Sequence, residues 1–339
     1  MRRAFAEQLR CVRCGGSFES DGHTQDQDID SGILSCVRCS QVYPVVDGIP
    51  RFVVGESYAS GFGMQWKRFR ATQLDSHSGV PITRDRFVAQ TAFAPDLRGM
   101  RVLDAGCGSG RFAEIALSLG ADLTALDLSS AVDACRDNLG EASTLSLMQA
   151  DLFQIPLGLQ SFDVVYCFGV LQHTPDPRDA FRALTEHVKP GGWLAVDVYR
   201  IPMYPLGLFA PKYLLRPLTR RMPPERLFDM VKRWMPGLLA VSNAIDRVPA
   251  VGHFVRKALP ISNYRGVYPL SEEQIHEWAV LDTFDQLSPR YDKPQTEAAV
   301  RGWFDPDTFT DVRVFEHGHI IAWGKVRESA TSGPASPAR

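Results

Sequence analysis

Short apolar runs recur along the middle of the chain and alternate with segments of a different periodicity. The runs between residues 99 and 198 include Val102–Leu103, Leu123–Leu126, Leu145–Met148 and Phe162–Cys167. The segment after the first run carries apolar residues at helical spacing, namely Phe112, Ala113, Ile115, Ala116 and Leu119. Strand-like runs that alternate with helix-like segments predict an α/β fold built on a parallel sheet.

The flanking regions follow other patterns. Val312–Phe315 and Ile320–Trp323 border a glycine turn at 317–319 and predict a closing hairpin. Four aromatic residues before the middle region fall on one face of a helix: Tyr58, Phe62, Trp66 and Phe69. We expect this face mainly to pack on the core, with one or two residues near a cofactor. Residues 189–192, Lys-Pro-Gly-Gly, predict a turn before a strand from Trp193 to Val198.

The residues after the first apolar run carry the first chemical signal. Asp104 is followed by Gly106, Gly108 and Gly110, which permit positive φ angles and let the backbone approach a ligand. A dinucleotide-binding turn needs a third glycine at position 111, and that position holds Arg111. The spacing G-x-G-x-G after an acid therefore favours a nucleoside-type cofactor other than a dinucleotide.

The stretch from Val102 to Phe112 resembles motif I of the class I S-adenosylmethionine (SAM)-dependent methyltransferases. Further features match that family in order: an acid at Asp127, a motif IV-like run at Phe162–Cys167, and the turn at 188–192. The resemblance implies a seven-stranded, mostly parallel, doubly wound sheet whose seventh strand is antiparallel. It also implies that the chain binds SAM.

The resemblance further implies which residues hold SAM. Asp127 would accept hydrogen bonds from the ribose hydroxyls, and Asp151 from the adenine amino group. Leu128 and Leu152 would sandwich the purine, and Phe168 lies where the family contacts the methionine moiety. The glycine loop completes the expected set with Asp104, Gly106, Cys107, Gly108 and Gly110.

Four of the seven cysteines form two close pairs, Cys11-x-x-Cys14 and Cys36-x-x-Cys39. Two such pairs supply the four thiolates of a closed, tetrahedral Zn²⁺ site, which predicts a structural metal; cysteines that merely pack are the alternative. Residues 15–35 contain five acids and no Lys or Arg, and we expect an exposed loop there. The whole segment 1–54 resembles the small zinc-ribbon protein that activates some RNA and protein methyltransferases, here fused in cis.

Composition limits the remaining interpretations. The 339 residues are 45% hydrophobic with a net charge of −2, which gives no reason to expect a nucleic-acid partner. No apolar run approaches the roughly 20 residues of a membrane span, and no signal-peptide core is visible, so we expect a cytoplasmic protein. Residues 200–260, however, carry eleven basic and three acidic residues. We interpret this block as a helical lid, with a membrane-surface contact or a pocket for an anionic acceptor as alternatives.

Together these features predict five segments along the chain. They are a zinc ribbon at 1–54, a helical linker at 55–98, a SAM-binding core at 99–199 and 295–328, an inserted helical cap at 200–294 and a disordered tail at 329–339.

Methyl transfer to a hydroxyl needs a base, because a neutral alcohol is a poor nucleophile. His173, which follows the fourth strand, is the first candidate, and a purely structural histidine is its alternative. Further candidates are Asp197, Tyr291 and His276. The N-P-P-Y-type signature of amino-methylating enzymes is absent from Cys167–Val170, which favours O-methylation of a small molecule, sugar or lipid-linked acceptor. Two other functions stay open: methylation of RNA or protein through the ribbon and cap, and a non-catalytic SAM-binding role.

Overall fold

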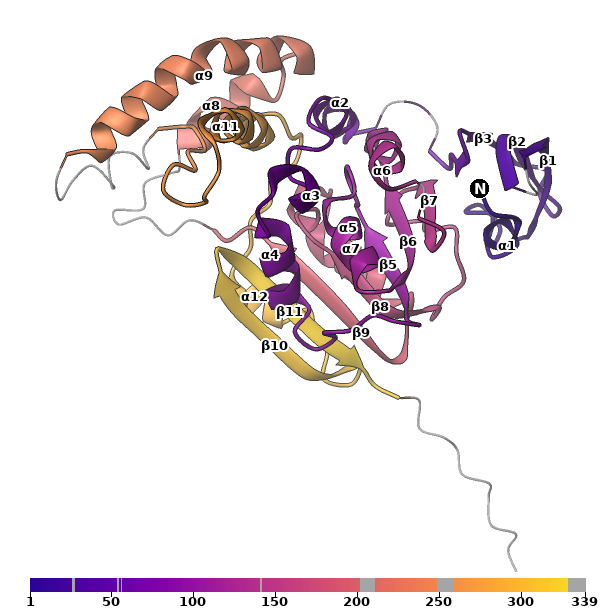
Figure 1. Cartoon of the computed structure of the whole chain (residues 1–339). Coiled ribbons are helices and arrows are strands. Elements are labelled where there is room, and N and C mark those ends of the chain that lie inside the picture. Colours follow the sequence, from indigo (N-terminus) through magenta and orange to yellow (C-terminus); the bar gives the residue numbers. More distant parts are fainter. Residues whose placement is uncertain are drawn as a thin grey trace, which may run out of the picture.

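The computed structural model describes residues 1–25, 28–53, 55, 57–140, 142–201, 211–248 and 259–328. At its centre is a seven-stranded sheet with the order β10-β11-β9-β8-β5-β6-β7 (Figure 1). The strands are β5 (Arg101–Ala105), β6 (Asp122–Asp127), β7 (Leu145–Gln149), β8 (Phe162–Cys167), β9 (Val188–Val198), β10 (Phe309–His317) and β11 (His319–Val326). β11 is antiparallel to β9 and β10, and the other pairs are parallel. The predicted sheet with an antiparallel seventh strand is confirmed.

Helices cover both faces of this sheet and explain why its central strands are apolar throughout. Adjacent residues of β5, Val102 and Leu103, are both fully buried, and because strand side chains alternate they belong to opposite clusters. One cluster includes α4 (Ile82–Gln90), α5 (Arg111–Ser118) and α6 (Ala131–Leu139). The other includes α7 (Pro177–Thr185) and α12 (Glu297–Arg301). The sheet is therefore doubly wound.

The turn predicted at 189–192 is instead part of strand β9. This strand already begins at Val188, where it pairs with Phe162 of β8, and the register shifts before Val164 pairs with Trp193. Gly191 absorbs the irregularity with a φ of +79°. The glycines thus mark a bulge inside a long strand. Gly and Pro occur at bulges as well as at turns, so the sequence did not distinguish the two.

The first fifty residues form a second, four-stranded antiparallel sheet. Its elements are α1 (Arg3–Ala6), β1 (Phe18–Gln25), β2 (Asp28–Cys36), β3 (Val42–Val46) and β4 (Ile49–Pro50). The prediction of an exposed loop at 15–35 is wrong, because residues 18–25 and 28–35 belong to the paired strands β1 and β2. Ile29 and Leu34 are buried on one side of β2, while acids such as Asp28 and Asp30 are exposed. The acids mark the outer face of a strand.

This small sheet is attached to the free edge of the large one. Arg51 forms a parallel bridge with Gln149 at the end of β7, and the backbone N–H of Phe52 donates to the Gln149 carbonyl over 2.8 Å. The Arg51 guanidinium also pairs with Asp133 of α6 at 2.5 Å, and Lys67 reaches the same carboxylate at 2.8 Å. One acid thereby joins the N-terminal sheet, α6 and the helix that carries Lys67.

Five helices lie outside the sheet's two faces: α2 (Ser60–Arg68), α3 (Asp75–Ser78), α8 (Pro211–Thr219), α9 (Pro224–Asp246) and α11 (Glu272–Leu287). Residues of α2, α9 and α11 form a third apolar cluster. Buried residues of α9 and α11, including Phe228, Leu227 and Phe284, enclose Phe69 from the predicted linker. Figure 1 shows α8, α9 and α11 on the opposite side of the core from the N-terminal sheet.

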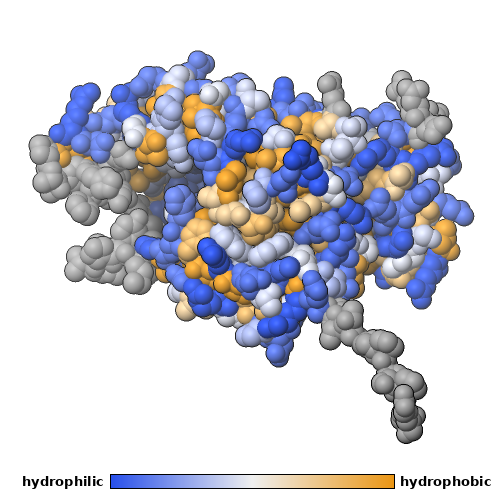
Figure 2. Space-filling view, turned by 60° about the horizontal axis from the view of Figure 1, so that its bottom comes forward, coloured by the Kyte–Doolittle hydropathy of each residue, from blue (hydrophilic) through white to orange (hydrophobic). Residues whose placement is uncertain are grey.

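The described residues contain no helix that is both long and apolar enough to cross a bilayer. The face in Figure 2 is mainly hydrophilic, with an apolar band through its middle. The predicted tail at 329–339 lies outside the described residues, as do 202–210 and 249–258 of the predicted cap.

Candidate active site

A cavity of about 960 Å³ lies at the carboxyl ends of the parallel strands. Its walls include the loop 106–109 after β5, the end of β6 at Asp127, and residues 168–170 after β8. Ligands of open α/β sheets bind at this edge, where consecutive loops diverge. α2, α8, α11 and the segment 259–268 close the other side. The volume lies within the roughly 300–1,000 Å³ of small-molecule sites.

The three loop glycines have different roles. All have positive φ angles, which side chains rarely adopt. A Cβ atom on Gly108 would lie 3.1 Å from Nε1 of Trp66, and one on Gly106 would lie 2.4 Å from a Val170 methyl group. A Cβ on Gly110 would instead meet Leu139 and Cys135, and Gly110 does not line the cavity. Two glycines therefore bring backbone to the cavity, and the third packs the loop against α6.

Asp127 lies on the cavity wall and holds the glycine loop in place. Its Oδ2 accepts a 3.0 Å hydrogen bond from the backbone N–H of Gly108, and its Oδ1 accepts bonds from the N–H and hydroxyl of Ser129. Burial raises the pKa of Asp127. Four more of the residues expected to bind SAM line the cavity beside it: Cys107, Leu128, Leu152 and Phe168.

Besides Gly110, two expected ligands do not line the cavity. Asp104 lies beneath the glycine loop, where its Oδ2 accepts a 2.9 Å hydrogen bond from the Tyr166 hydroxyl. Burial raises the pKa of Asp104 to about 8, against the opposing effect of that hydrogen bond. Asp151 lies next to the wall residues Ala150 and Leu152 and accepts a bond from the N–H of Phe153. Asp104 therefore links the ends of β5 and β8 through its bond to Tyr166.

The aromatic residues of the linker face the cavity more than the sequence suggested. Tyr58, Phe62 and Trp66 all line it, whereas Phe69 packs against Phe228 with ring centroids 5.7 Å apart. The expectation that this face serves mainly the core is therefore wrong. α2 lies across the glycine loop because Gly108 leaves room for the Trp66 indole.

His173 ends the short helix η1 (Leu171–His173) and is one of the residues of the cavity wall. Its Nδ1 lies 3.0 Å from the backbone carbonyl oxygen of Tyr291, and its Nε2 is buried without a hydrogen-bond partner among the described residues. A carbonyl only accepts hydrogen bonds, so Nδ1 carries a proton, and in the neutral imidazole the lone pair lies on Nε2. The rings of Phe62 and Tyr199 fix the imidazole at centroid distances of 5.2 and 5.4 Å.

The other candidate bases are placed differently. Asp197 is buried away from the cavity lining, pairs with Arg86, and accepts hydrogen bonds from Gln90 and from the backbone N–H of Gly169. Burial opposes its ionisation, but the Arg86 guanidinium outweighs that effect and lowers the pKa of Asp197. Tyr291 contributes its carbonyl to His173, while its side chain contacts the Tyr58 ring. His276 does not line the cavity.

Residues 103–196, which contain the glycine loop, Asp127 and His173, match the family described as "Methyltransferase domain". This region is therefore similar to a methyltransferase domain, and it is called the methyltransferase domain below. The matched residues contain nearly all of the parallel strands of the large sheet, and the antiparallel strand β11 lies outside them.

Several proteins are similar to part of this chain. The ubiquinone biosynthesis O-methyltransferase of Albidiferax ferrireducens is 38% identical over 128 residues, 36% of this chain and 51% of the relative. Its namesake from Xanthomonas oryzae pv. oryzae is 34% identical over 163 residues, 46% of this chain and 66% of the relative. A solved S-adenosylmethionine dependent methyltransferase from Mesorhizobium loti has 31% identity and a TM-score of 0.31, covering 33% of this chain and 52% of that one. The chain thus spans between half and two thirds of these relatives.

Beyond the methyltransferase domain's loops, the cavity has a second half that the sequence did not reveal. It is lined by Arg111, Tyr199, Tyr264, Tyr268, Trp278, Asp282, Asp285 and His319. Burial lowers the pKa of Arg111 to about 10 and that of His319 to about 4, and raises that of Asp282 to about 6. These residues come from segments far apart in the chain, and no local pattern marks them as a group.

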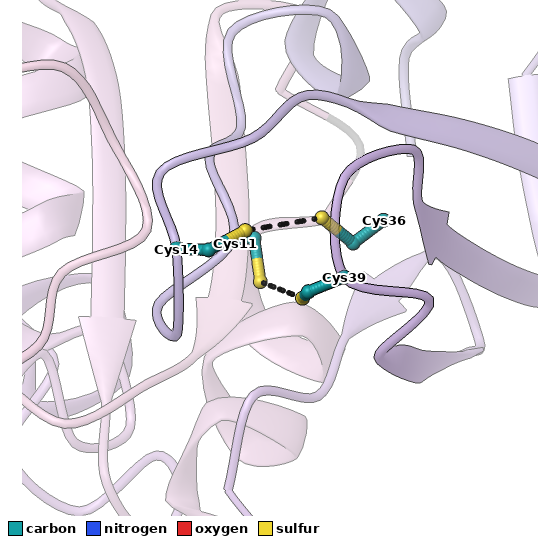
Figure 3. Close-up of side chains that lie close together, drawn as sticks. All are labelled: Cys11, Cys14, Cys36 and Cys39. Atoms are coloured by element: carbon teal, nitrogen blue, oxygen red, sulfur yellow. Dashed lines mark hydrogen bonds between the residues drawn. The ribbon is translucent and has the colours of Figure 1, made fainter.

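A separate cluster of cysteines lies outside the methyltransferase domain. Figure 3 shows Cys11 and Cys14 on one loop and Cys36 and Cys39 on another, with their sulfurs directed toward each other. The sulfurs of Cys11 and Cys39 are 3.7 Å apart, those of Cys14 and Cys36 are 3.5 Å apart, and all four lie within 4.8 Å of one another. A Cβ on Gly16 would approach the Cys36 sulfur to 3.0 Å, so glycine keeps the cluster compact.

Proposed function

We propose that this protein transfers a methyl group from SAM to a hydroxyl group of an acceptor. The methyltransferase domain and the two relatives named as O-methyltransferases support the reaction class. Neither relative supports the RNA, protein or non-catalytic alternatives. The observation that carries the hydroxyl assignment is the buried, unpartnered Nε2 of His173 at the cavity.

The cavity residues fit SAM at the end nearest the parallel strands. Asp127 would hold the ribose hydroxyls, Leu128 and Leu152 the adenine, and Phe168 the methionine moiety. The approach of backbone at Gly106 and Gly108, where a Cβ would collide with Val170 or Trp66, supports this placement. When bound, SAM supplies an electrophilic methyl group on a sulfonium.

His173 would act as the general base. Its Nε2 would take up the proton of the acceptor's hydroxyl group, while bound SAM would supply the methyl carbon and the sulfur leaving group. The Tyr291 carbonyl keeps the imidazole in the tautomer that can receive this proton. A positioned base of this kind contributes about 10²- to 10⁴-fold to a rate. We assign Asp197 a positioning role, because it holds the N–H of Gly169 beside Phe168.

We propose that the acceptor occupies the second half of the cavity. Tyrosine hydroxyls, Asp282, Asp285 and Arg111 offer both donors and acceptors there, and Trp278 and the tyrosine rings offer flat apolar surfaces. This mixture suits a hydroxylated small molecule or saccharide. The proposed cap at 200–294 and linker at 55–98 supply most of these walls to the core at 99–199 and 295–328.

We further propose that residues 1–54 are a zinc ribbon. Tetrahedral Zn²⁺ with bonds of about 2.3 Å places its sulfur ligands about 3.8 Å apart, close to the distances in the cysteine cluster. Hydrogen bonds from the N–H groups of Arg38 and Cys39 outweigh desolvation and lower the pKa of Cys36 to about 6, which favours a thiolate. The four sulfurs leave no place for water, so the metal would be structural.

Calorimetric titration of the purified full chain with SAM, and separately with NADH, tests the cofactor. We expect binding of SAM and none of NADH. Incubation with methyl-labelled SAM and a panel of hydroxylated small molecules and saccharides then tests the reaction, with label expected on oxygen. NADH binding without SAM binding, or label found only on nitrogen or in macromolecules, would contradict the proposal.

A further inference from the structure

Helix α8 is inverted relative to an ordinary surface helix. Its polar residues Lys212, Arg216 and Thr219 face the protein, and Arg216 and Thr219 are only 6% and 5% exposed. Its leucines face outward instead: Leu214 and Leu218 are each 71% exposed and Leu215 is 39% exposed. Surface helices normally bury the apolar stripe and expose the polar one, so this arrangement needs an explanation.

Specific bonds fix the polar face inward. The Arg216 guanidinium donates to the carbonyl of Gln286 over 3.0 Å and to that of Pro289 over 2.8 Å. The Thr219 hydroxyl donates to the carbonyl of Leu287 over 2.9 Å. These carbonyls lie at and just beyond the end of α11, where helical C=O groups lack partners and a cation is favoured. Lys212 also pairs with the buried Asp292 at 2.9 Å.

The outward leucines are therefore a fixed feature of α8 and not the result of a loosely held helix. The neighbouring helix α9 adds two more exposed apolar side chains, Trp234 at 61% and Val241 at 50%. Single exposed apolar residues are common on proteins. Three exposed leucines on one face of a nine-residue helix instead form a continuous apolar surface.

The charged residues near this apolar surface are mostly basic and favour an anionic partner. Arg220 and Arg221 directly follow α8, both are exposed, and neither forms an ion pair among the described residues. The described stretch 211–248 has eight basic and three acidic residues in a chain whose net charge is −2. Leucines flanked by unpaired arginines suit the boundary of a bilayer with anionic headgroups, where leucines enter the acyl region and arginines reach the phosphates.

We propose that α8 docks on an anionic membrane surface through Leu214, Leu215 and Leu218. The same helix lines the cavity with Lys212 and Tyr213. Docking therefore places one wall of the cavity against the membrane. Where the proposed function holds, on which this last step rests, the acceptor is a membrane-held amphiphile whose polar, hydroxylated head enters the cavity.

Vesicle co-sedimentation of the full chain tests the docking without any need for activity. Vesicles of phosphatidylcholine alone are compared with vesicles of equal parts phosphatidylcholine and phosphatidylglycerol. We expect binding to the anionic vesicles that weakens as salt is added, because salt screens the arginines. The double variant Leu214→Ser/Leu218→Ser should lower the binding constant roughly tenfold or more, since two apolar side chains no longer enter the bilayer.

Leu159→Ser is the matched control, because Leu159 is 63% exposed in the turn before β8, outside the cap. It should bind as the wild type does, and all three proteins should unfold at the same temperature. Equal binding to both vesicle types, equal binding by the double variant, or equal loss in the control would overturn the proposal. Dissociation of a wild-type dimer by the double variant, without vesicle binding, would instead assign the surface to a second copy of the chain. SAM binding, measured separately, distinguishes a failure of this proposal from a failure of the proposed function.

Discussion

At the scale of single residues, the site depends on which polar atoms are satisfied and which are left free. His173 combines a nitrogen held by the Tyr291 carbonyl with one that has no described partner, whereas both oxygens of Asp197 are engaged. The same contrast separates Asp127 on the cavity wall from Asp104 beneath it. The sequence alone offers both residues of each pair as candidates, and only their hydrogen-bond partners and positions distinguish them.

Replacement of His173 should remove catalysis while leaving cofactor binding intact. We expect His173→Gln to lower kcat by about 10²- to 10⁴-fold, because the amide cannot take up the hydroxyl proton. Affinity for SAM, measured by calorimetry, should stay close to that of the wild type. His276→Gln, which changes a histidine away from the cavity, is the control and should retain full activity. Wild-type turnover by His173→Gln would exclude this residue as the base.

Asp104 should make stability fall with rising pH. Its pKa in the folded protein, about 8, is above the value of about 3.9 in an unfolded chain, so the folded state binds the proton more tightly. The resulting stabilisation is complete below the unfolded pKa and is lost as pH rises through the folded one. Asp104→Asn, which resembles the protonated acid, should lack this dependence.

Urea unfolding of Asp104→Asn and the wild type at about pH 5 and about pH 9 measures this effect. The free energy of unfolding of the wild type should fall relative to the variant by on the order of 3 kcal/mol between the two conditions. Other titrating groups are shared by both proteins and cancel in the comparison. Parallel pH profiles would show that Asp104 is ionised in the folded protein.

At the scale of elements, the cofactor end of the cavity is formed where α2 lies across the glycine loop. The contact is close because Gly108 has no side chain beneath the Trp66 indole. α2 is also tied to α6 through the Lys67–Asp133 ion pair. Helix α2 and the glycine loop are therefore held together, and a change at their contact should affect ligand binding.

Gly108→Ala should weaken SAM binding by about tenfold or more, because the new methyl group displaces Trp66 and adds backbone strain at a φ of +54°. Gly79→Ala is a matched control, since Gly79 has a φ of +72° but no atom within 4 Å of an added Cβ. The control should lose a similar small amount of stability, seen as a lower melting temperature, and should keep its SAM affinity. Equal affinity in both variants would show that the Trp66 contact is unimportant.

At the scale of the whole molecule, the N-terminal sheet extends the edge of the core. It bonds to β7 through Arg51 and Phe52, and to α6 through the Arg51–Asp133 pair. These bonds cover the end of β7, which is an edge strand of the large sheet. Loss of the small sheet should therefore be felt by the methyltransferase domain as well.

The variant Cys11→Ser/Cys36→Ser should lose one equivalent of zinc and have a lower melting temperature. Elemental analysis measures the metal, and thermal unfolding measures the loss, which should be several kcal/mol because structural zinc supplies folding free energy directly. Cys135→Ala, which removes a buried cysteine outside the cluster, should retain its zinc. A wild type purified without metal would refute the ribbon.

The sequence by itself determined the features whose cause is local. Continuous apolar runs such as Val102–Leu103 specify strands buried on both faces, glycines at 106, 108 and 110 specify a loop with positive φ angles, and paired cysteines specify two facing turns. Each signal is contained in a few neighbouring residues. Where local signals were ambiguous, as with the acids at 15–35 and the glycines of β9, pairing with a neighbouring strand made the segment a strand.

The tertiary structure alone decided which side chains meet. His173 is oriented by a carbonyl 118 residues away, Arg216 turns α8 inward through bonds to residues 70 and 73 positions further along, and Tyr58, Phe62 and Trp66 turn from the core to the cavity. Such contacts depend on how separate elements pack, and no periodicity along the chain records them. The physical reason is that a side chain's partners, burial and free lone pairs are set by neighbours in space, while propensity and spacing describe only neighbours in sequence.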